Sequence, residues 1–300
     1  MSKSSFRGRF LLRISLRVLV KNNFVDIFVL NWNQKNLSLK CIESLTKLTY
    51  KNNRIFFIDN GSTDGSHIAV KDQFPTVNIL RSKKNLGYSK GNNFGFNAVK
   101  KHSEYSIFLN NDTTVDPSFI EPLIAQLEND KDTILVAPKI FYAQSEDIIW
   151  FAGGRVNLLF ASISHYGIRS KNIKKFNSVR KIGYATGCCF GVRSLDFSEI
   201  GMFNEEFSMY GEDVDLSLNA KRNGGSIYFI PNSMVWHHVS SSLGGRFSFA
   251  KWKKKTFGIF KLIKLHISPL ILPIPMVFLF VNSFFSLIVF SILRIFTKDD

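Results

Sequence analysis

The sequence Tyr105-Ser-Ile-Phe-Leu-Asn-Asn-Asp112 decides the fold of this chain. Its Ile-Phe-Leu run is short, apolar and without helical period, which is typical of a strand buried on both faces of a parallel sheet. The run ends in Asn110, Asn111 and Asp112, at the edge where open α/β sheets bind ligands. Such an oxygen-rich cluster suits a divalent cation that shares its coordination sphere with substrate phosphates. The alternative is a plain turn, because Asn and Asp are turn formers and Pro117 can open the next helix.

Segments typical of strands and helices alternate around this stretch. The expected strands are 25–30, 54–59, 77–81, 105–110 and 133–137, and the expected helices are 36–48, 66–73, 84–101 and 117–129. Strands that alternate with helices at this spacing predict βαβ units with right-handed crossovers. We therefore expect an α/β, Rossmann-like fold with a mostly parallel central sheet and helices on both faces.

The alternation weakens between residues 140 and 182 and then returns. A turn between strands is expected at 151–155, and the basic stretch 169–181 is expected to be an exposed loop. A helix is expected to open at 210–216 and to end near the glycine pair 224–225. A strand at 227–230 follows, with a second strand or its edge at 235–238.

The net charge of +16 is concentrated in three segments of the 300-residue chain. Segments 1–23, 169–181 and 246–264 hold six, six and seven basic residues and no acidic ones. The remainder of the chain therefore carries a net charge of −3. A nucleic-acid-binding protein is disfavoured, because the charge lies in segments compatible with a membrane surface and no RNA- or DNA-binding motif is present.

The cysteine pattern gives no sign of a disulfide framework. The three cysteines are Cys41, Cys188 and Cys189, and two of them are adjacent. No CxxC spacing typical of a metal site occurs. A reducing compartment fits this pattern best.

The C-terminal segment predicts a membrane helix at about 268–296. No Lys, Arg, Asp or Glu occurs between Lys264 and Arg294, and this length can cross a hydrocarbon core. Prolines crowd its start, so the regular helix is expected to begin near Met276. The basic cluster 246–264 on its amino side places the body of the protein at the cytoplasmic face of the inner (plasma) membrane by the positive-inside rule. A membrane-embedded hairpin and a buried soluble helix are the alternatives.

The N-terminal segment 1–23 predicts a basic amphipathic helix. Arg9, Arg13, Arg17 and Lys21 recur every four residues among apolar side chains. Such a helix suits an anionic membrane surface. A solvated arm without a role is the alternative.

Two polar segments are candidates for nucleotide binding. Asp59 ends the second expected strand, where a carboxylate can accept a hydrogen bond from a base or a ribose hydroxyl. A tight turn capped by Asp64 is the alternative for this segment. The run 85–93, Asn-Leu-Gly-Tyr-Ser-Lys-Gly-Asn-Asn, is similar to a phosphate-cradling loop at a helix start, although the GxGxxG spacing is absent.

Glu212 and Asp213 are the candidates for acid–base chemistry. Adjacent carboxylates on the first turn of a helix are favoured by the helix dipole, so a capping role is one interpretation. They also follow the aromatic residues Phe207 and Tyr210 and the flexible Gly211. A carboxylate near such apolar groups can have its pKa raised into a range useful for proton abstraction.

The pair His237-His238 offers one further metal ligand. The two side chains face opposite sides if they lie in a strand, so at most one of them reaches a pocket. A structural role is the more common one for a single histidine. A metal held by Asp112 would need a partner of this kind.

In their order and spacing, these segments resemble the inverting family 2 glycosyltransferases with a GT-A fold, and most closely the bacterial rhamnosyltransferase-like branch. The resemblance covers about residues 25–243. The matching runs are 29–33, 58–64, 85–93, 109–112, 186–187, 210–216 and 235–237. Each run is weak by itself, and the ordered combination is specific.

The resemblance implies a role for each matching position. It implies that Asp213 is the general base, with Glu212 beside it at the acceptor site, and that Asp112 and His237 hold Mg²⁺ or Mn²⁺. The donor-binding residues that it implies are Asn31, Asp59, Asn60, Asn85, Gly87, Gly91, Asn92, Asn93, Asn110 and Asn111. The chain departs from the family at Asn110, where the first carboxylate of a DxD motif would stand, and at Asn219, where relatives often carry arginine.

The resemblance also implies an activity and a domain plan. Residues 24–245 are expected to be the glycosyltransferase domain, with 1–23 and 246–300 as appendages that contact the membrane. The expected reaction moves a sugar from dTDP-rhamnose or a UDP-sugar to a hydroxyl of a lipid-linked saccharide in cell-surface polysaccharide synthesis. The alternatives are a nucleotidyltransferase-like enzyme and a catalytically weakened sugar-nucleotide-binding protein. The sequence does not fix the donor sugar or the acceptor.

Overall fold

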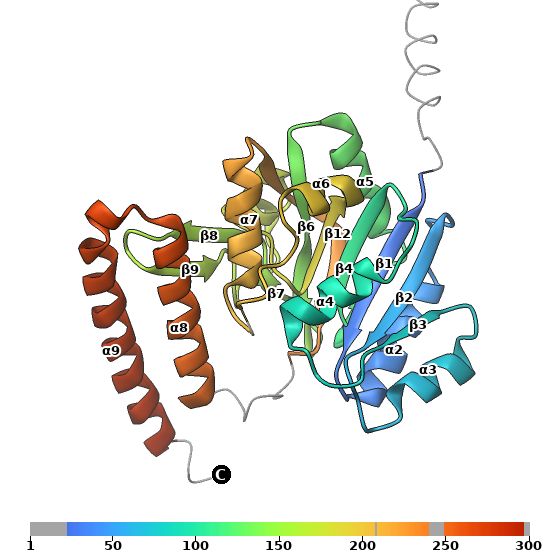
Figure 1. Ribbon diagram of the computed structural model, residues 1–300, viewed down its shortest axis with the longest axis horizontal. Helices are drawn as coiled ribbons and strands as arrows, with labels where there is room; N and C mark the ends of the chain where they lie inside the picture. Colours follow the sequence, from blue (N-terminus) through green and yellow to red (C-terminus); the bar gives the residue numbers. More distant parts are fainter. Residues whose placement is uncertain (1–22, 208, 240–248, 297–300) are drawn as a thin grey trace, which may run out of the picture.

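The computed structural model describes residues 23–207, 209–239 and 249–296 (Figure 1). The strands are β1 Val25–Asn31, β2 Asn53–Asp59, β3 Asn78–Arg81, β4 Tyr105–Asn110, β5 Thr113–Val115, β6 Thr133–Tyr142, β7 Ser145–Phe151, β8 Gly154–Asn157, β9 Ser162–His165, β10 Arg180–Lys181, β11 Cys189–Arg193 and β12 Ser226–His237. The α-helices are α2 Lys35–Thr46, α3 Ser66–Gln73, α4 Tyr88–Asn97, α5 Ile120–Asn129, α6 Ser194–Glu199, α7 Glu212–Arg222, α8 Phe249–His266 and α9 Pro273–Phe296. Two short 3₁₀ helices are η1 Lys174–Phe176 and η2 Pro269–Ile271.

The central sheet is mixed, and the expected parallel direction holds for β3, β2, β1, β4, β6 and β12 but not for β5, β7, β10 and β11. Its strand order is β10-β12-β6-β11-β4-β1-β2-β3, with β5 on β12 and β7 on β6. Strands β3, β2, β1 and β4 are parallel, as the βαβ pattern predicts. Strand β11 then lies antiparallel between β4 and β6. It enters the sheet after the irregular 140–182 region, where the alternation of strands and helices no longer constrains direction.

A row of stacked aromatic rings fixes the register at the centre of this sheet. Phe56, Phe28, Phe108 and Phe190 lie at paired positions on β2, β1, β4 and β11. The centroids of neighbouring rings are 5.3, 5.2 and 5.0 Å apart. If one of these strands slipped by one residue, its ring would move to the other face of the sheet and leave the row. The row therefore holds the four strands in one register.

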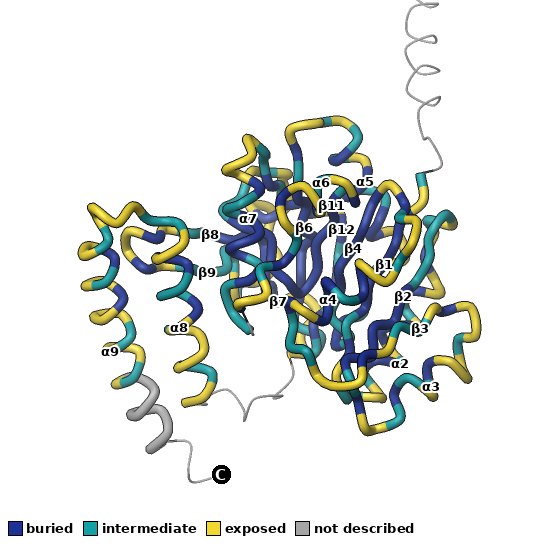
Figure 2. The backbone as a smooth tube through the Cα atoms, viewed as in Figure 1, coloured by how far each residue is buried: buried dark blue, intermediate teal, exposed yellow. Residues whose placement is uncertain are grey.

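Helices cover both faces of the sheet, and the strands between them are largely buried (Figures 1 and 2). On one face, the Phe108 ring packs against Phe96 of α4 and Phe197 of α6. Ile107 precedes it on β4 and therefore points to the opposite face. On that face, Ile107 and Leu123 of α5 lie on either side of Gly191.

Most of the expected elements of residues 25–142 are present with shifted ends. The helix expected at 117–129 begins at Ile120, and the strand expected at 133–137 continues to Tyr142 as β6. The expected turn at 151–155 lies between β7 and β8. The expected edge strand at 235–238 is the end of the long strand β12. The predicted amphipathic helix at 1–23 lies outside the described residues except for its last residue.

Helices α8 and α9 lie side by side at the end of the molecule that also carries the β8–β9 hairpin (Figure 1). Helix α9 begins at Pro273 rather than near Met276, because proline is well tolerated in the first helical turn. In the part of the chain that the structure describes, no helix is both long and apolar enough to cross a membrane. The predicted C-terminal membrane helix is therefore not supported.

Helix α8 is docked on α7 by polar and apolar contacts. His266 Nε2 lies 2.6 Å from the Asp215 carboxylate, and both side chains are buried. Arg222 donates to the carbonyl oxygen of Leu265 at 3.1 Å. A Cβ on Gly258 would lie 2.3 Å from the carbonyl oxygen of Tyr210, so the two segments are in direct contact.

Truncation of Phe108 to alanine should destabilise the fold strongly. The side chain is fully buried and contacts rings from both neighbouring strands and from α6. Loss of a buried phenylalanine typically costs about 3–5 kcal/mol. The free energy of unfolding, measured in urea, should fall by this amount, whereas Leu195→Ala, at a side chain that is 77% exposed, should change little. Equal effects of the two variants would contradict the role given to the aromatic row.

Candidate active site

Asn31, at the carboxyl end of β1, is the centre of a buried hydrogen-bond network. Its amide nitrogen donates to the hydroxyls of Ser62 and Ser66 at 3.0 and 2.8 Å. Its carbonyl oxygen accepts from the Ser38 hydroxyl at 2.8 Å and from the Asn111 amide at 2.9 Å. The Asn31 side chain is fully buried and uses both ends of its amide within the protein. Its contribution to the site is therefore to position the surrounding loops.

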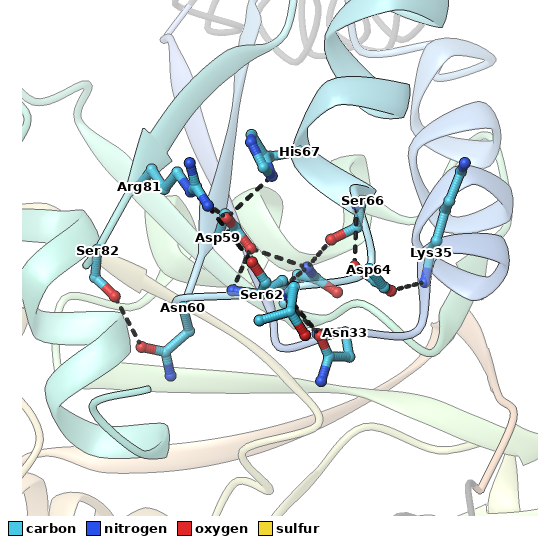
Figure 3. Close-up of polar contacts among 12 residues, drawn as sticks. Asn33, Lys35, Asp59, Asn60, Ser62, Asp64, Ser66, His67, Arg81 and Ser82 are labelled. Atoms are coloured by element: carbon cyan, nitrogen blue, oxygen red, sulfur yellow. Dashed lines mark hydrogen bonds and ion pairs between the residues drawn. The ribbon is translucent and has the colours of Figure 1, made fainter. Parts of the chain in front are cut away.

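Asp59, at the carboxyl end of β2, is also buried and paired (Figure 3). Its carboxylate accepts from Arg81 Nε at 3.0 Å and from the backbone N–H of Ser62 at 3.2 Å, and it lies 3.3 Å from His67 Nδ1. The Arg81 side chain is 53% exposed, so its positive charge lies between the buried carboxylate and the surface. Arg81 and His67 were not predicted from the sequence, although Arg81 ends β3, the neighbour of β2.

The loop before α4 is held by Asn60. The Asn60 amide donates to Asn85 Oδ1 at 3.1 Å and to the carbonyl oxygen of Gly87 at 3.0 Å. Its own carbonyl oxygen accepts from the backbone N–H of Leu86 at 2.9 Å. Gly87 has a φ of +82°, which favours glycine at this position before the helix. The loop is therefore preformed, with the Asn85 side chain exposed beside it.

Three further predicted donor-binding residues on α4 are buried in protein contacts. A Cβ on Gly91 would lie 2.8 Å from Leu30, so this glycine permits close packing of the helix on β1. The Asn92 amide donates to a carbonyl oxygen of its own helix at 3.1 Å. The Asn93 amide donates to the carbonyl oxygen of Phe203 at 2.8 Å and thereby ties α4 to the segment before α7. A direct contact of these residues with a donor stays a prediction.

Asp112 and His237 are brought together from the turn after β4 and from β12. Strand β5 pairs with β12 so that His237 lies opposite Thr113, the residue after Asp112. His237 Nε2 lies 3.2 Å from Asp112 Oδ1, and each residue is 8% exposed. His238 takes part through its backbone, whose N–H donates to the carbonyl oxygen of Asp112 at 2.8 Å. This backbone hydrogen bond holds the end of β12 against the turn.

Asp112 and His237 provide two side-chain ligands for a divalent cation, which is fewer than such an ion needs. A carboxylate oxygen and an imidazole nitrogen are suitable ligands for Mn²⁺ or Mg²⁺. Among the described residues, no group of three or more His, Cys, Asp or Glu side chains is placed to hold a metal ion. Asn110 supplies an amide where a third protein ligand with a carboxylate would stand. A bound metal would therefore depend on a diphosphate and water for its other ligands.

Asp213 and Glu212 form the first turn of α7 in different environments. Asp213 accepts hydrogen bonds from the backbone N–H groups of Gly187 at 3.1 Å and Val214 at 2.9 Å. Burial raises the pKa of Asp213, and these backbone hydrogen bonds oppose the shift. Glu212 is buried, and its Oε2 has no hydrogen-bond partner among the described residues. Burial raises the pKa of Glu212 to about 8, and the charge of Asp213 adds to the shift.

These two carboxyl groups line a cavity of about 380 Å³. Its walls come from the β9 strand, the loop before α7, and α8. Six of the residues that line it are His165, Tyr184, Tyr210, Lys255, Ile259 and Leu262. Tyrosine rings and aliphatic side chains beside two carboxyl groups suit a sugar ring with one hydroxyl to be deprotonated.

Gly187 connects the Asp213 carboxylate to the sheet and to α4. Its N–H donates to Asp213, and its carbonyl oxygen accepts from the Tyr88 hydroxyl at 2.5 Å. The carbonyl oxygen of the next residue, Cys188, accepts from the backbone N–H of Asn110 at 3.0 Å. One short segment therefore contacts Asp213, the start of α4 and the turn that carries Asp112. The contact of Tyr88 was not predicted from the sequence.

The model of the family described as glycosyl transferase family 2 matches residues 26–201, which is more than half of the chain. The chain belongs to glycosyl transferase family 2. The family predicted from the sequence is thereby confirmed, and the chain carries a glycosyltransferase domain. The matched region includes the Asp59 loop, the start of α4 and the turn at Asp112, and it ends before Glu212 and Asp213.

Relatives of this glycosyltransferase include proteins of bacterial glycan synthesis. N-acetylglucosaminyl-diphospho-decaprenol L-rhamnosyltransferase of Mycobacterium tuberculosis is 24% identical over 221 residues, which cover 68% of this chain and 72% of the relative. O-antigen biosynthesis protein RfbC of Myxococcus xanthus is 26% identical over 227 residues, which cover 73% of this chain and 17% of that protein. These matches support the rhamnosyltransferase-like branch.

A solved structure has a similar fold. The crystal structure of GalNAc-T7 with UDP, GalNAc and Mn²⁺ superposes with a TM-score of 0.60 at 18% sequence identity. The likeness covers 72% of this chain and 43% of that one, so this glycosyltransferase spans less than half of the solved chain. At this identity the likeness concerns the fold, and it confirms a GT-A-like α/β fold with a mixed central sheet.

Replacement of Glu212 by Gln should remove a loss of stability that the wild type shows as the pH rises from 4.5 to about 8. The pKa of Glu212 is raised from 4.5 to about 8 in the folded chain, so the unfolded chain releases this proton first as the pH rises. The wild type should therefore lose stability between these two pH values, by up to about 1.4 kcal/mol per pH unit. Glu212→Gln should be the more stable protein at pH 8, with little difference at pH 4.

Urea unfolding at pH 4, 6 and 8 measures this difference. The control is Glu146→Gln, at an exposed side chain outside the cavity, and its stability should follow that of the wild type. Stability curves for Glu212→Gln and the wild type that run parallel across this range would contradict the burial of an ionisable Glu212.

Proposed function

We propose that this glycosyltransferase moves a sugar from a nucleotide-diphosphosugar to a hydroxyl of a saccharide acceptor, with inversion at the anomeric carbon. The convergence at Gly187 and Cys188 carries this proposal. Hydrogen bonds from this segment reach Asp213, Tyr88 and Asn110. These contacts support a base held close to the proposed donor site, as a direct displacement requires.

Asp213 is the proposed general base. The two backbone N–H groups that it accepts from fix the orientation of its carboxylate at the cavity. There it takes the proton from the acceptor hydroxyl as that oxygen attacks the anomeric carbon from the side opposite the leaving diphosphate. Glu212, whose pKa is raised to about 8 by burial, keeps its proton at neutral pH and donates a hydrogen bond to an acceptor oxygen.

Asp112 and His237 are the proposed metal ligands, for Mg²⁺ or Mn²⁺. When bound, such an ion offsets negative charge on the departing diphosphate. The observation in support is the 3.2 Å approach of His237 Nε2 to Asp112 Oδ1 from two different segments of the chain. The solved relative was crystallised with UDP and Mn²⁺.

The proposed donor is dTDP-rhamnose or a UDP-sugar, and the proposed acceptor is a lipid-linked saccharide of cell-surface polysaccharide synthesis. The Mycobacterium tuberculosis relative is named for rhamnosyl transfer to a diphospho-decaprenol-linked sugar. We place the enzyme at the cytoplasmic face of the inner membrane. The basic segment 246–264 and the exposed apolar side chains of α9 support this location.

The second candidate is a sugar-nucleotide-binding protein with weakened catalysis. The observation that favours it is the amide of Asn110 in place of a carboxylate, which leaves two protein ligands for the metal. The products distinguish the alternatives: the proposed transferase releases a nucleoside diphosphate, a nucleotidyltransferase releases pyrophosphate, and a binding protein releases neither.

The first test is a thermal-shift screen of the full chain with UDP, dTDP and GDP, each with Mn²⁺ or with a chelator. A ligand that binds only the folded state raises the melting temperature by mass action. Stabilisation by one nucleotide that is lost on chelation is expected. The absence of a shift with all three nucleotides would refute the proposed donor site.

Asp213→Asn should abolish transfer and leave donor binding nearly intact. The amide cannot accept the acceptor proton, and general base catalysis typically contributes about 100- to 10,000-fold. Sugar transfer should fall by at least about 100-fold, while the thermal shift caused by the nucleotide is retained. Asp72→Asn, at an exposed position on α3, serves as the control. Transfer by Asp213→Asn at the wild-type rate would show that another group is the base.

Asn110→Asp should strengthen metal-dependent nucleotide binding. A carboxylate at this position adds a charged ligand to the turn that holds Asp112, and ligand charge raises cation affinity. The Mn²⁺ concentration for half-maximal nucleotide stabilisation should fall by about tenfold. Asn97→Asp adds the same charge at an exposed site at the end of α4 and should leave this concentration unchanged. An unchanged requirement in Asn110→Asp would remove position 110 from the metal site.

A further inference from the structure

Two cavities meet beside the proposed acceptor site. The first, of about 380 Å³, contains Glu212 and Asp213. The second, of about 320 Å³, lies between the β8–β9 hairpin and the helices α8 and α9. Ile163, Lys255 and Ile259 line both cavities, so the two cavities are neighbours on either side of these three side chains.

The second cavity has a polar lining suited to an anion. Hydroxyl groups of Ser162, Thr256, Ser283 and Ser286 contribute to it, together with the amide of Asn282, which also donates to the carbonyl oxygen of Phe160 at 2.9 Å. The hydroxyls of Thr256 and Ser283 lie 3.4 Å apart. None of these side chains is charged. Hydroxyl and amide groups of this kind are common partners of phosphate oxygens.

Lys255 stands where the two cavities meet. Of the described residues that line either cavity, it is the sole Lys or Arg. His165 is neutral, because burial and the nearby charge of Lys255 together lower the pKa of His165 to about 4. The positive charge at the junction therefore comes from Lys255.

Helix α9 has a polar face toward this cavity and an apolar face away from it. Leu279, Asn282, Ser283 and Ser286 follow the i, i+3, i+4, i+7 spacing of one helix face, and all four line the cavity. The exposed apolar stripe of α9 repeats the same spacing, and much of this helix is exposed in Figure 2. The stripe consists of Val277, Phe280, Val281, Phe284 and Ile288, with exposures between 39% and 72%.

We propose that Lys255 and the hydroxyl-lined cavity bind the diphosphate of a lipid-linked acceptor, whose saccharide enters the first cavity and whose hydrocarbon chain leaves the second cavity and passes around α9 to its apolar stripe. The saccharide part of this inference rests on the proposed function. Each part of such a molecule meets matching chemistry in one order: carboxyl groups and tyrosines, then a cation with hydroxyls, then apolar side chains. A soluble sugar phosphate would leave the apolar stripe unused.

The test measures binding of farnesyl diphosphate to the full chain by titration calorimetry, with farnesol and inorganic pyrophosphate as matched probes. A chelator is present so that a metal at Asp112 and His237 makes no contribution. The wild type should bind farnesyl diphosphate at least about tenfold more tightly than either probe, because only this ligand uses both the cation and the apolar stripe.

Variants of Lys255 and its neighbour on α8 localise the site. Lys255→Ala should weaken farnesyl diphosphate binding by about tenfold, as expected for loss of a charge-assisted contact. Lys255→Arg should retain most of the affinity. Lys254→Ala removes the same charge from an exposed position that lines neither cavity and should have no effect. Equal weakening by Lys254→Ala and Lys255→Ala, or no weakening by Lys255→Ala, would overturn the proposal.

Two further readouts separate this inference from the proposed function. Lys255→Ala should raise the KM for a lipid-diphosphate acceptor and leave the nucleotide-induced thermal shift unchanged. Binding of farnesyl diphosphate that depends on Lys255, without any nucleotide-induced shift, would support the lipid-diphosphate site and refute the transferase. If nucleotide binding and sugar transfer occur and neither changes in Lys255→Ala, the transferase is supported and the lipid-diphosphate site is refuted.

Discussion

The two backbone hydrogen bonds of Gly187 are the constraint on which the site depends. Its N–H orients the Asp213 carboxylate, and its carbonyl oxygen receives the Tyr88 hydroxyl. A Cβ at this position would lie 2.8 Å from the Tyr88 oxygen, so a larger residue would displace the Tyr88 side chain from this contact. Because Gly187 lies just before β11, the position of the Asp213 carboxylate is set by the sheet itself.

The antiparallel direction of β11 explains how Gly187, which contacts Asp213, comes to lie near Asn110 and Asp112. The start of β11 pairs with the end of β4, with Cys189 opposite Leu109. The beginning of β11 therefore lies at the sheet edge where the parallel strands end and where Asn31 and Asp59 stand. A parallel β11 would have placed Gly187 at the other edge, away from Asn110. The mixed sheet is thus a requirement of the site.

Local patterns predicted the first half of the fold, and contacts between distant residues decided the rest. Strands β1 to β4 were predicted from apolar runs that each end in polar residues. The family motifs identified Asp112, His237 and Asp213 as candidate site residues. The direction of β11 depends on pairing across the irregular 140–182 region, which carries no periodic signal. The ion pair of Asp59 with Arg81 spans 22 residues, so the type of residue at 59 could not show that its carboxylate is already satisfied.

Helices α8 and α9 lie beyond the matched family domain; α8 borders the cavity that contains Asp213 and Glu212, and both helices border the neighbouring cavity. The family match ends at residue 201, so the cavity wall formed by α8 lies outside it. The buried contact of His266 with Asp215 fixes α8 to α7, the helix that begins with Glu212 and Asp213. Leu262 of α8 packs near Gly211, just before α7. The position of Lys255 is therefore coupled to that of Asp213. In the proposed reaction, the matched domain would hold the donor, and helices α8 and α9 would select the acceptor that reaches Asp213.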